Sequence, residues 1–433
     1  MLGYYFELAL RSFRRSPGLT ALMLLTLAMG VAACMTTLTV FHVLSADPVP
    51  GKSDKLFYVQ LDSQPLRGFK PGDEPADQLT RFDAEALLRD AKGVHQAVMT
   101  AGNVAITPEG QGKASFFSQG RFTSADFFAM FDTPFQYGSG WSKTEDEAKD
   151  RVAVITRSLN DELFGGANSV GKNIRLRGKD FRIVGVLDHW QPVPHFYDLT
   201  IGSFGELEKV FIPFSTSQEL RFGAMGSMWC WGNVTGDPRG VNAPCGWLQY
   251  WVQLDTPAQV SAYHDYLMNY SDRQREAGRF ERPSRAVLSD VMSWLRKKQV
   301  VPDDISLQLW LAFGFLAVCL TNTVGLLLAK CLRRSGDIGV RRALGASRRE
   351  IFKQFLVEAG SLGLVGGLLG LGLTLLGLWG VRHGGSQYAR LIELDLPMLA
   401  TTLGLALLAS LIAGLLPAWR ACQVMPAIQL KTQ

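Results

Sequence analysis

The sequence predicts a membrane protein with four transmembrane α-helices and a large α+β domain inserted between the first and the second helix. Two observations predict this fold class: four long stretches without Asp, Glu, Lys or Arg, and a polar segment of mixed strand and helix patterns after the first of them. At a rise of about 1.5 Å per residue, each stretch covers roughly 34 to 40 Å, more than a hydrocarbon core of about 30 Å. The predicted spans are residues 18–44, 305–329, 359–381 and 396–419.

Positive charge sets the predicted orientation. The segment from Lys330 to Lys353 holds eight Lys or Arg residues against two acids, whereas the loop 382–395 holds two residues of each sign. Cytoplasmic loops carry the excess of Lys and Arg, so the basic segment is expected inside the cell. The expected cytoplasmic segments are therefore 1–17, 330–358 and 420–433, and the expected outer segments are 45–304 and 382–395.

The six cysteines divide by this topology. Four lie in the predicted spans or on the cytoplasmic side, and Cys230 and Cys245 lie in the outer segment. An oxidising compartment permits a disulfide between these two, which stabilises a short loop by about 3 kcal/mol. Two unpaired thiols are the alternative.

The outer segment mixes strand and helix patterns, which favours an α+β fold. Thr123 and Asp126 have capping-box spacing and predict the start of a short helix. Gly178 is the predicted pivot of a hairpin. The predicted strands are 56–61, 113–122, 151–156, 173–187 (both arms of the hairpin), 209–215 and 247–254, and the predicted helices are 81–91, 123–131, 157–166, one near Thr216, 258–276 and 284–298.

The stretch from Gly166 to Lys172, GANSVGK, matches the opening of a phosphate-binding loop. The next residue is Asn173 rather than the Ser or Thr whose hydroxyl holds magnesium. The expected order is also helix, loop, strand, the reverse of a phosphate-binding loop. We interpret this stretch as a glycine-rich turn.

Other catalytic and binding patterns are weak. His189 and His195 are six residues apart, but no neighbouring Cys or carboxylate cluster completes a metal site, so both are expected to be ordinary surface histidines. The sequence contains neither a GxSxG nor an HExxH motif. No basic stripe with interleaved aromatic residues suggests nucleic-acid binding. The sequence predicts no catalytic, cofactor or metal site in this chain.

Four tryptophans, Trp229, Trp231, Trp247 and Trp251, surround the cysteine pair. One interpretation is a docking surface for a partner protein or an apolar cargo. The other is a small satellite of the core, held down by the disulfide.

Between the second and third spans, the sequence predicts two helices joined at a glycine. Asp337 to Leu344 has helical spacing, and Gly345 interrupts it. Ser347 and Glu350 have capping-box spacing, so a second helix is expected to begin at once and continue into the third span. A basic elbow of this kind suits docking in a cleft of a cytoplasmic protein. The alternative is that its arginines only set topology and contact anionic lipid.

The third span carries two interleaved GxxxG pairs, which let helix backbones approach closely in lipid. They are expected to pack against a neighbouring span, because a glycine that faces lipid weakens a helix without a compensating contact. The pairs are Gly363 with Gly367 and Gly366 with Gly370.

Three groups of segments, in the same order along the chain, resemble a known family. They are ELALRSFRRSPGLTALMLLTLAMGVAA at the first span; FTSADFFAMF, RVAVITRSLNDELFGGANSVGKNIRLRGKDFRIVGVL and VFIPFSTSQ in the outer segment; and GDIGVRRALGASRREIFKQFLVEA with IAGLLPAWRACQVMPAIQLK around the last two spans. The outer segments resemble the periplasmic core domain of MacB. The chain as a whole resembles the MacB/FtsX family of ABC transporter permeases.

The resemblance implies a mechanism called mechanotransmission. Closure of a cytoplasmic ATPase dimer moves a coupling helix and the spans, and the periplasmic domain shifts in response. It implies that ATP and Mg²⁺ are bound by a separate ATPase subunit and not by this chain, unlike the MacB efflux pump, whose ATPase is fused upstream of the first span. By position the coupling helix is about 337–346, and the ATPase-coupling residues are Asp337, Arg341, Arg342, Leu344, Gly345, Arg348 and Arg349.

The resemblance also implies partners and a bacterial inner-membrane location. The partners are the ABC ATPase, a second permease in a homodimer or heterodimer, membrane lipid and, for efflux, a periplasmic adaptor and an outer-membrane channel. Three functions remain open: efflux or secretion, lipoprotein extraction of the Lol type, and FtsX-like regulation of periplasmic hydrolases. The length of the outer segment, 45–304, favours the first two, since the regulator branch is expected to carry a much smaller domain. A membrane-bound enzyme is a distant fourth.

Overall fold

The computed structural model describes residues 13, 16–108, 114–205, 207–383 and 396–422. The chain divides into two compact units, one of residues 1–45 with 301–433 and one of residues 46–300. The predicted cytoplasmic segment 1–17, the outer loop 382–395 and the tail 420–433 lie largely outside the described residues.

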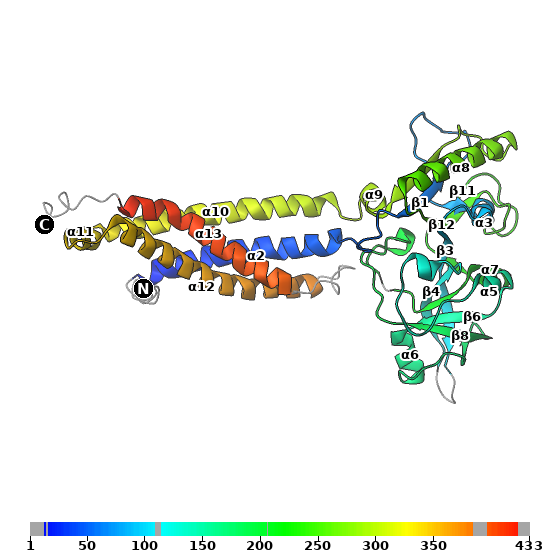
Figure 1. Cartoon of the computed structure of the whole chain (residues 1–433), viewed down its shortest axis with the longest axis horizontal. Helices are drawn as coiled ribbons and strands as arrows, with labels where there is room; N and C mark the ends of the chain where they lie inside the picture. Colours follow the sequence, from blue (N-terminus) through cyan, green and yellow to red (C-terminus); the bar gives the residue numbers. More distant parts are fainter. Residues whose placement is uncertain (1–12, 14–15, 109–113, 206, 384–395, 423–433) are drawn as a thin grey trace. The chain divides into compact units, whose positions relative to one another are not determined.

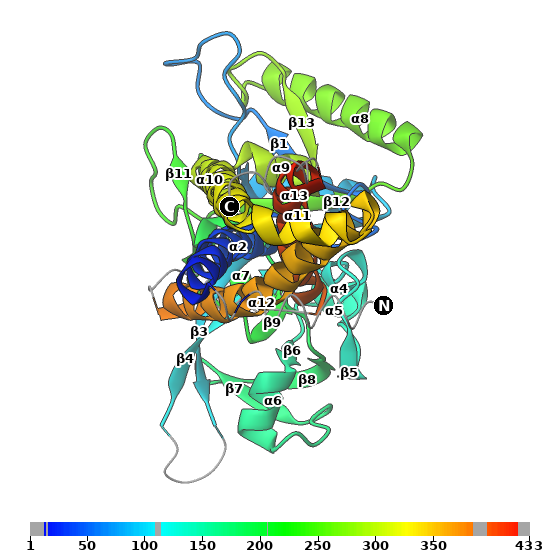
Figure 2. The same ribbon diagram turned by 90° about the vertical axis from the view of Figure 1, so that its left-hand side faces the viewer.

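The first unit is a bundle of long helices that run side by side (Figure 1). Within the described residues, four helices are long and apolar enough to cross a membrane. The short helix α11 lies across one end of the bundle, as Figure 2 shows in a view along the long helices. The helices are α2 (Pro17–Ser45), α10 (Asp303–Arg333), α11 (Ser335–Ala343), α12 (Arg348–His383) and α13 (Leu396–Cys422).

The second unit is built on one mixed sheet. Its main path runs β13-β1-β12-β3-β4-β9-β6-β8-β5, and β4 with β9 and β6 with β8 are the parallel neighbours along it. The strands are β1 (Leu56–Leu61), β2 (Leu79–Thr80), β3 (His95–Thr107), β4 (Phe116–Thr123), β5 (Phe135–Gly138), β6 (Val152–Thr156), β7 (Asn173–Leu176), β8 (Lys179–Leu187), β9 (Val210–Pro213), β10 (Ala224–Met225), β11 (Trp229–Cys230), β12 (Cys245–Gln253) and β13 (Ala286–Asp290).

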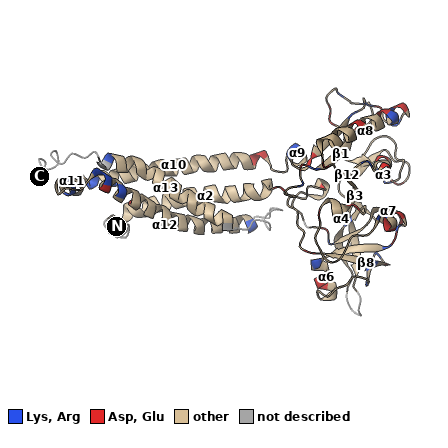
Figure 3. Cartoon of the chain, in the orientation of Figure 1, with Lys and Arg blue, Asp and Glu red and all other residues tan. Residues whose placement is uncertain are grey.

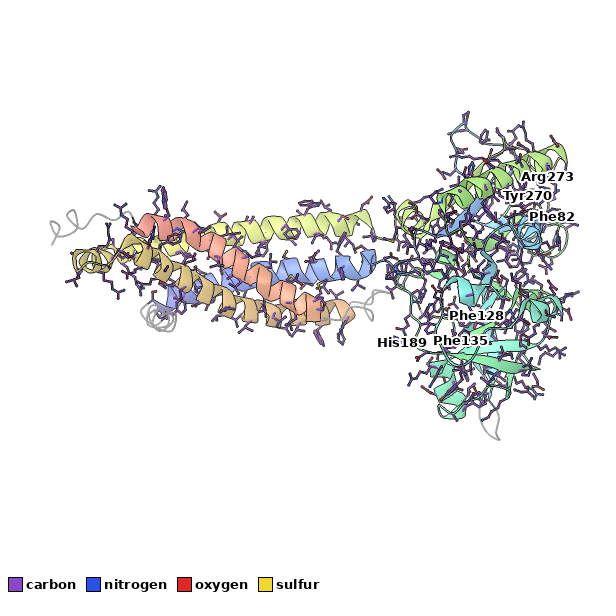
Figure 4. The ribbon with its side chains drawn as sticks, viewed as in Figure 1. Phe82, Phe128, Phe135, His189, Tyr270 and Arg273 are labelled. Atoms are coloured by element: carbon purple, nitrogen blue, oxygen red, sulfur yellow. A yellow bond between two sulfur atoms is a disulfide. The ribbon has the colours of Figure 1, made fainter. Side chains whose placement is uncertain are left out.

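Helices cover the sheet and enclose a core on each face. Successive strand residues point to opposite faces, so Val59 enters one core and Tyr58 the other. Phe128 and Phe135 meet in the second core with ring centroids 5.5 Å apart (Figure 4). The helices are α3 (Arg81–Asp90), α4 (Phe127–Met130), α5 (Lys143–Glu147), α6 (Arg157–Phe164), the 3-10 helix η1 (Leu199–Ile201), α7 (Phe214–Glu219), α8 (Pro257–Glu276) and α9 (Val291–Lys297). The predicted fold class, four spans with an inserted α+β domain, is confirmed.

Two predicted elements of this unit are wrong. The helix expected at 284–298 begins only at Val291, because Ala286–Asp290 pairs with β1 as the edge strand β13. The capping box expected at Thr123 and Asp126 does not form. Thr123 ends β4 and donates to the carbonyl of Val98 at 3.0 Å, so a contact between strands takes the hydroxyl.

The structure also shows where the predicted glycine turns and the two histidines of the outer segment lie. The GANSVGK stretch lies between α6 and β7, where Gly166 and Gly171 adopt φ of +80° and +88°. The hairpin turns at Gly178, with φ of +75°. His189 is exposed, but the prediction of a surface position for His195 is wrong, since that side chain is 4% exposed.

Candidate functional site

The elbow between α10 and α12 is the candidate site. Helix α11 ends at Ala343, and the backbone reverses at Gly345, whose φ of +100° favours glycine. A reciprocal capping box then starts α12. The Glu350 amide donates to Ser347 Oγ at 3.2 Å, and the Ser347 amide donates to Glu350 Oε2 at 3.0 Å. These bonds fix the angle at which the chain enters α12.

An apolar cluster holds α11 to the bundle. Ile338 is 7% exposed and packs with Ile351 and Phe355 of α12 and with Cys331 of α10. Arg341 Nη1 also donates to Gln354 Oε1 at 3.1 Å, across the elbow. These contacts hold α11 against both α10 and α12.

The outer face of the elbow exposes both apolar and basic groups. Leu344, at the tip, is 83% exposed, and Val340, one turn earlier, is 52% exposed. Arg341, Arg348 and Arg349 are exposed around them. Lys and Arg residues gather at this end of the bundle (Figure 3). An exposed leucine on the same elbow as three exposed arginines suits a partner cleft with an apolar floor and an acidic rim.

A shallow hollow of about 260 Å³ lies beside the start of α12. Its lining combines cationic and aromatic side chains: Arg348, Arg349, Phe352, Lys353 and Trp419. This hollow extends the basic face of the elbow toward the end of α13.

The predicted coupling residues come together here. Six of the seven occupy the elbow: Arg341, Arg342, Leu344, Gly345, Arg348 and Arg349. The backbone of the seventh, Asp337, lies in α11, and its side chain is outside the described part of the chain. A buried ion pair that the sequence did not predict lies next to them. Lys330 Nζ lies 2.5 Å from Glu358 Oε1, and these side chains are 4% and 3% exposed.

The ion pair joins α10 to α12, one charge at the end of each apolar run. The ring of Phe13 lies 5.0 Å from Lys330 Nζ and covers it. A single acid in an apolar helical run needs a buried partner, so Glu358 was the signal that could have predicted this pair.

The four predicted packing glycines occupy two faces of α12. A Cβ on Gly363 would lie 2.8 Å from Ser410 Cβ, and a Cβ on Gly367 would lie 2.8 Å from Ala406 Cβ. Both of these neighbours are on α13. A Cβ on Gly366 would lie 2.8 Å from Leu27 on α2, and one on Gly370 would lie 3.2 Å from the Ala28 carbonyl of α2. Each GxxxG pair therefore lets one neighbouring helix approach α12 closely.

Cys230 and Cys245 are joined by a disulfide between the paired strands β11 and β12. The tryptophans around them do not form one patch. Trp247 and Trp251 are buried in the two opposite cores, and Trp229 is 63% exposed. Neither interpretation offered for the four tryptophans therefore describes them all.

A second buried charge cluster lies inside the periplasmic-type unit and was also missed. Arg121 Nη1 lies 2.5 Å from Asp198 Oδ2, and its Nη2 pairs with Glu208. Tyr197 donates to Glu208 Oε2 at 2.8 Å. Burial alone would raise the pKa of Glu208, but the Arg121 guanidinium holds it below its ordinary value. Burial also lowers the pKa of His195, which faces this cluster.

Comparison with known proteins places these features in a family. Residues 20–270 match the MacB-like periplasmic core domain, and residues 309–426 match the FtsX-like permease C-terminal domain. The chain is 25% identical over 369 residues to the pyoverdine export ATP-binding/permease protein PvdT of Pseudomonas aeruginosa, covering 85% of this chain and 50% of that protein. It is 25% identical over 440 residues to the macrolide export ATP-binding/permease protein MacB of Marinobacter nauticus, covering 98% and 60%.

The chain therefore spans about half the length of the curated relatives that it matches. Among solved structures, the periplasmic region of MacB from Actinobacillus actinomycetemcomitans matches with a TM-score of 0.37 and 12% identity, over 58% of this chain and 95% of that one. The extracellular domain of the noncanonic ABC-type transporter YknZ from Gram-positive bacteria matches with a TM-score of 0.34 and 10% identity, over 54% and 99%.

The periplasmic core profile matches more than half of the chain, and the permease profile covers the last three long helices. Together with four apolar helices, these matches identify a multi-pass inner-membrane protein whose large domain lies in the periplasm. The chain belongs to the MacB/FtsX family of ABC transporter permeases.

Proposed function

We propose that this chain is the permease subunit of an exporter powered by a separate cytoplasmic ABC ATPase. The elbow at 335–350 receives the motion of the ATPase, and the long helices carry it to the periplasmic domain. ATP and Mg²⁺ bind the ATPase subunit. A second permease completes the dimer, and a periplasmic adaptor and an outer-membrane channel complete the export route.

One observation carries this proposal: the 83% exposed Leu344 at the tip of an elbow that is otherwise tightly held. An apolar side chain presented to water on a fixed support is typical of a docking contact. The exposed arginines of the elbow supply charge for recognition of an acidic partner. The rigid attachment supplies the mechanical link.

Two further observations bear on export and on nucleotide binding by one stretch of this chain. The relatives named above are both export proteins. In this chain, the stretch that comes nearest to a phosphate-binding loop joins a helix to a strand and continues with Asn173. That geometry lacks the helix N-terminus and the hydroxyl that a phosphate-binding loop uses.

The test is charge reversal at the elbow. Arg341→Glu with Arg342→Glu is expected to abolish stimulation of the ATPase by the permease while membrane insertion is retained. Leu344→Ala, which changes no charge, is expected to weaken ATPase binding. The matched control is Arg273→Glu with Arg275→Glu, the same charge change on two exposed arginines of α8 (Figure 4). Unchanged co-purification and export in both elbow variants would refute the proposal.

A further inference from the structure

The shallow hollow beside the start of α12 has the composition of an anion-binding site. Two helices line it: α12 contributes Arg348, Arg349, Phe352 and Lys353, and α13 contributes Trp419. Three of these five side chains are cationic, and no Asp or Glu is among them. A volume of about 260 Å³ is therefore bordered by three positive charges and two aromatic rings.

Neighbouring acids do not neutralise this charge. Glu350 is the nearest acid in sequence, and its carboxylate accepts a hydrogen bond from the Ser347 amide at 3.0 Å. Within the part of the chain that the structure describes, no carboxylate forms a salt bridge with Arg349 or Lys353. These two cations are one helical turn apart, so they repel each other. An anion bound between them would remove this repulsion.

Trp419 places the hollow at the depth of the lipid headgroups. The apolar run of α13 ends at this residue, and Arg420 follows it. Tryptophan is enriched where the hydrocarbon core meets the headgroup layer. Because Trp419 lines the hollow together with Arg349 and Lys353, these cations lie near the headgroup layer.

An exposed apolar stripe runs along α13 to the same hollow. We name it the α13 stripe; it consists of Leu408, Ile412, Leu415 and Trp419. These residues recur in steps of four, three and four, so they share one face of the helix. Their exposed fractions are 62%, 61%, 48% and 55%. A free phosphate ion gains nothing from an apolar stripe, whereas acyl chains are as apolar as these side chains.

We propose that the hollow binds an anionic glycerophospholipid, with its phosphodiester held by Arg349 and Lys353 and its acyl chains along the α13 stripe. The guanidinium donates two parallel N–H groups to phosphate oxygens, and the ammonium adds a compact charge. Trp419 joins the two parts of the site, since it lines the hollow and ends the stripe. This inference goes beyond the proposed function and does not depend on a separate ATPase.

The positive-inside rule alone does not account for this arrangement. The rule requires basic residues on the cytoplasmic side, but it does not require them to converge on one hollow beside a tryptophan. Basic pockets between membrane helices on that side suit the headgroups of anionic lipids. Arg349 also lies between Ser347 and Glu350, which cap α12. A lipid phosphate on Arg349 therefore adds a contact at the point where the elbow enters α12.

Lipid photocross-linking to the purified full chain tests the inference. The chain is delipidated in detergent, and the ATPase is left out because Arg349 is also a predicted coupling residue. The probe is phosphatidylglycerol with a photoreactive group in one acyl chain, and mass spectrometry locates the adducts, which are expected on residues 408–419. Phosphatidylcholine with the same acyl chain carries no net charge and is expected to bind roughly tenfold more weakly.

Charge removal then identifies the groups that hold the headgroup. Lys353→Gln is expected to weaken phosphatidylglycerol binding roughly fivefold, the effect of one charge near the membrane surface, and its combination with Arg349→Gln roughly twentyfold. Arg333→Gln is the matched control, because Arg333 is exposed at the end of α10 and does not line the hollow. This control is expected to bind the lipid as the native chain does. Because Lys353 is exposed, its variant is expected to unfold at the native temperature.

Three outcomes would overturn the inference. Equal binding of phosphatidylglycerol and phosphatidylcholine would exclude recognition of the anion. Equal losses in Lys353→Gln and Arg333→Gln would show a diffuse attraction to the whole basic end of the bundle. Glycerol 3-phosphate carries the phosphate without acyl chains and is expected not to displace the lipid, so full displacement by it would make the hollow a site for a free phosphate ester.

Discussion

Removal of one charge from the Lys330–Glu358 pair is the most informative single perturbation of the bundle. At the observed separation of 2.5 Å, an effective dielectric of about 20 gives a gross attraction of roughly 7 kcal/mol. Desolvation of two side chains that are 4% and 3% exposed offsets most of it. Glu358→Leu leaves the buried ammonium without its counter-charge, so we expect a loss of about 3–5 kcal/mol in the free energy of unfolding.

The assay is a double-mutant cycle on the purified full chain in detergent. Unfolding is measured for Glu358→Leu, for Lys330→Met and for the double variant. The double variant is expected to be far more stable than the sum of the single losses predicts, because neither charge then remains buried alone. The control is Arg175→Met, which breaks the exposed Arg175–Asp180 pair, whose side chains are 54% and 58% accessible. The expected change in the free energy of unfolding for this control is below about 1 kcal/mol. Additive losses at Lys330 and Glu358 would refute the reasoning.

Three further predictions concern packing, the disulfide and pH. Gly367→Leu places side-chain atoms against α13 and is expected to lower the free energy of unfolding by about 1–3 kcal/mol. Gly372→Leu is the control and is expected to lower it little, because no atom lies within 4 Å of the Cβ position there. Equal effects of the two substitutions on thermal unfolding would contradict the packing role. Reduction of the Cys230–Cys245 disulfide is expected to lower the stability of the periplasmic unit by about 3 kcal/mol, and non-reducing peptide mapping should recover the linked pair, so free thiols at both would refute it. The pKa of His195 is lowered in the folded state, so its contribution to the free energy of unfolding is complete above the ordinary histidine pKa of about 6.5 and is lost as the pH falls below that value. His195→Phe should therefore reduce the pH dependence of the free energy of unfolding below about pH 6.5. An unchanged pH dependence in this variant would contradict the prediction.

Local chemistry made much of the fold predictable. The spans follow from length and the absence of charge, and the elbow follows from Gly345 and the Ser347–Glu350 spacing, both of which act within one turn of helix. The glycine pairs followed from a spacing that has one physical use in lipid. These signals depend on residues that are neighbours in sequence.

Features that depend on distant residues were not predictable in this way. The segment 286–290 has apolar residues compatible with a helix, and its pairing with β1, more than 200 residues earlier, decides its conformation. Thr123 matches a helix cap but bonds to Val98 in a neighbouring strand. The same limit applies to Arg121, whose two buried acids lie 77 and 87 residues away. A single sequence carries the charges of such clusters but not their pairing.

Site-specific photocross-linking from Leu344 tests the central claim most directly. The reactive residue is placed at position 344 in the full chain, in membranes that contain the native ATPase complement. The expected result is an adduct that mass spectrometry identifies as an ABC ATPase bearing its own phosphate-binding loop, with no such adduct from the exposed Leu368 of α12. An ATPase adduct from position 368 and none from position 344 would contradict the account.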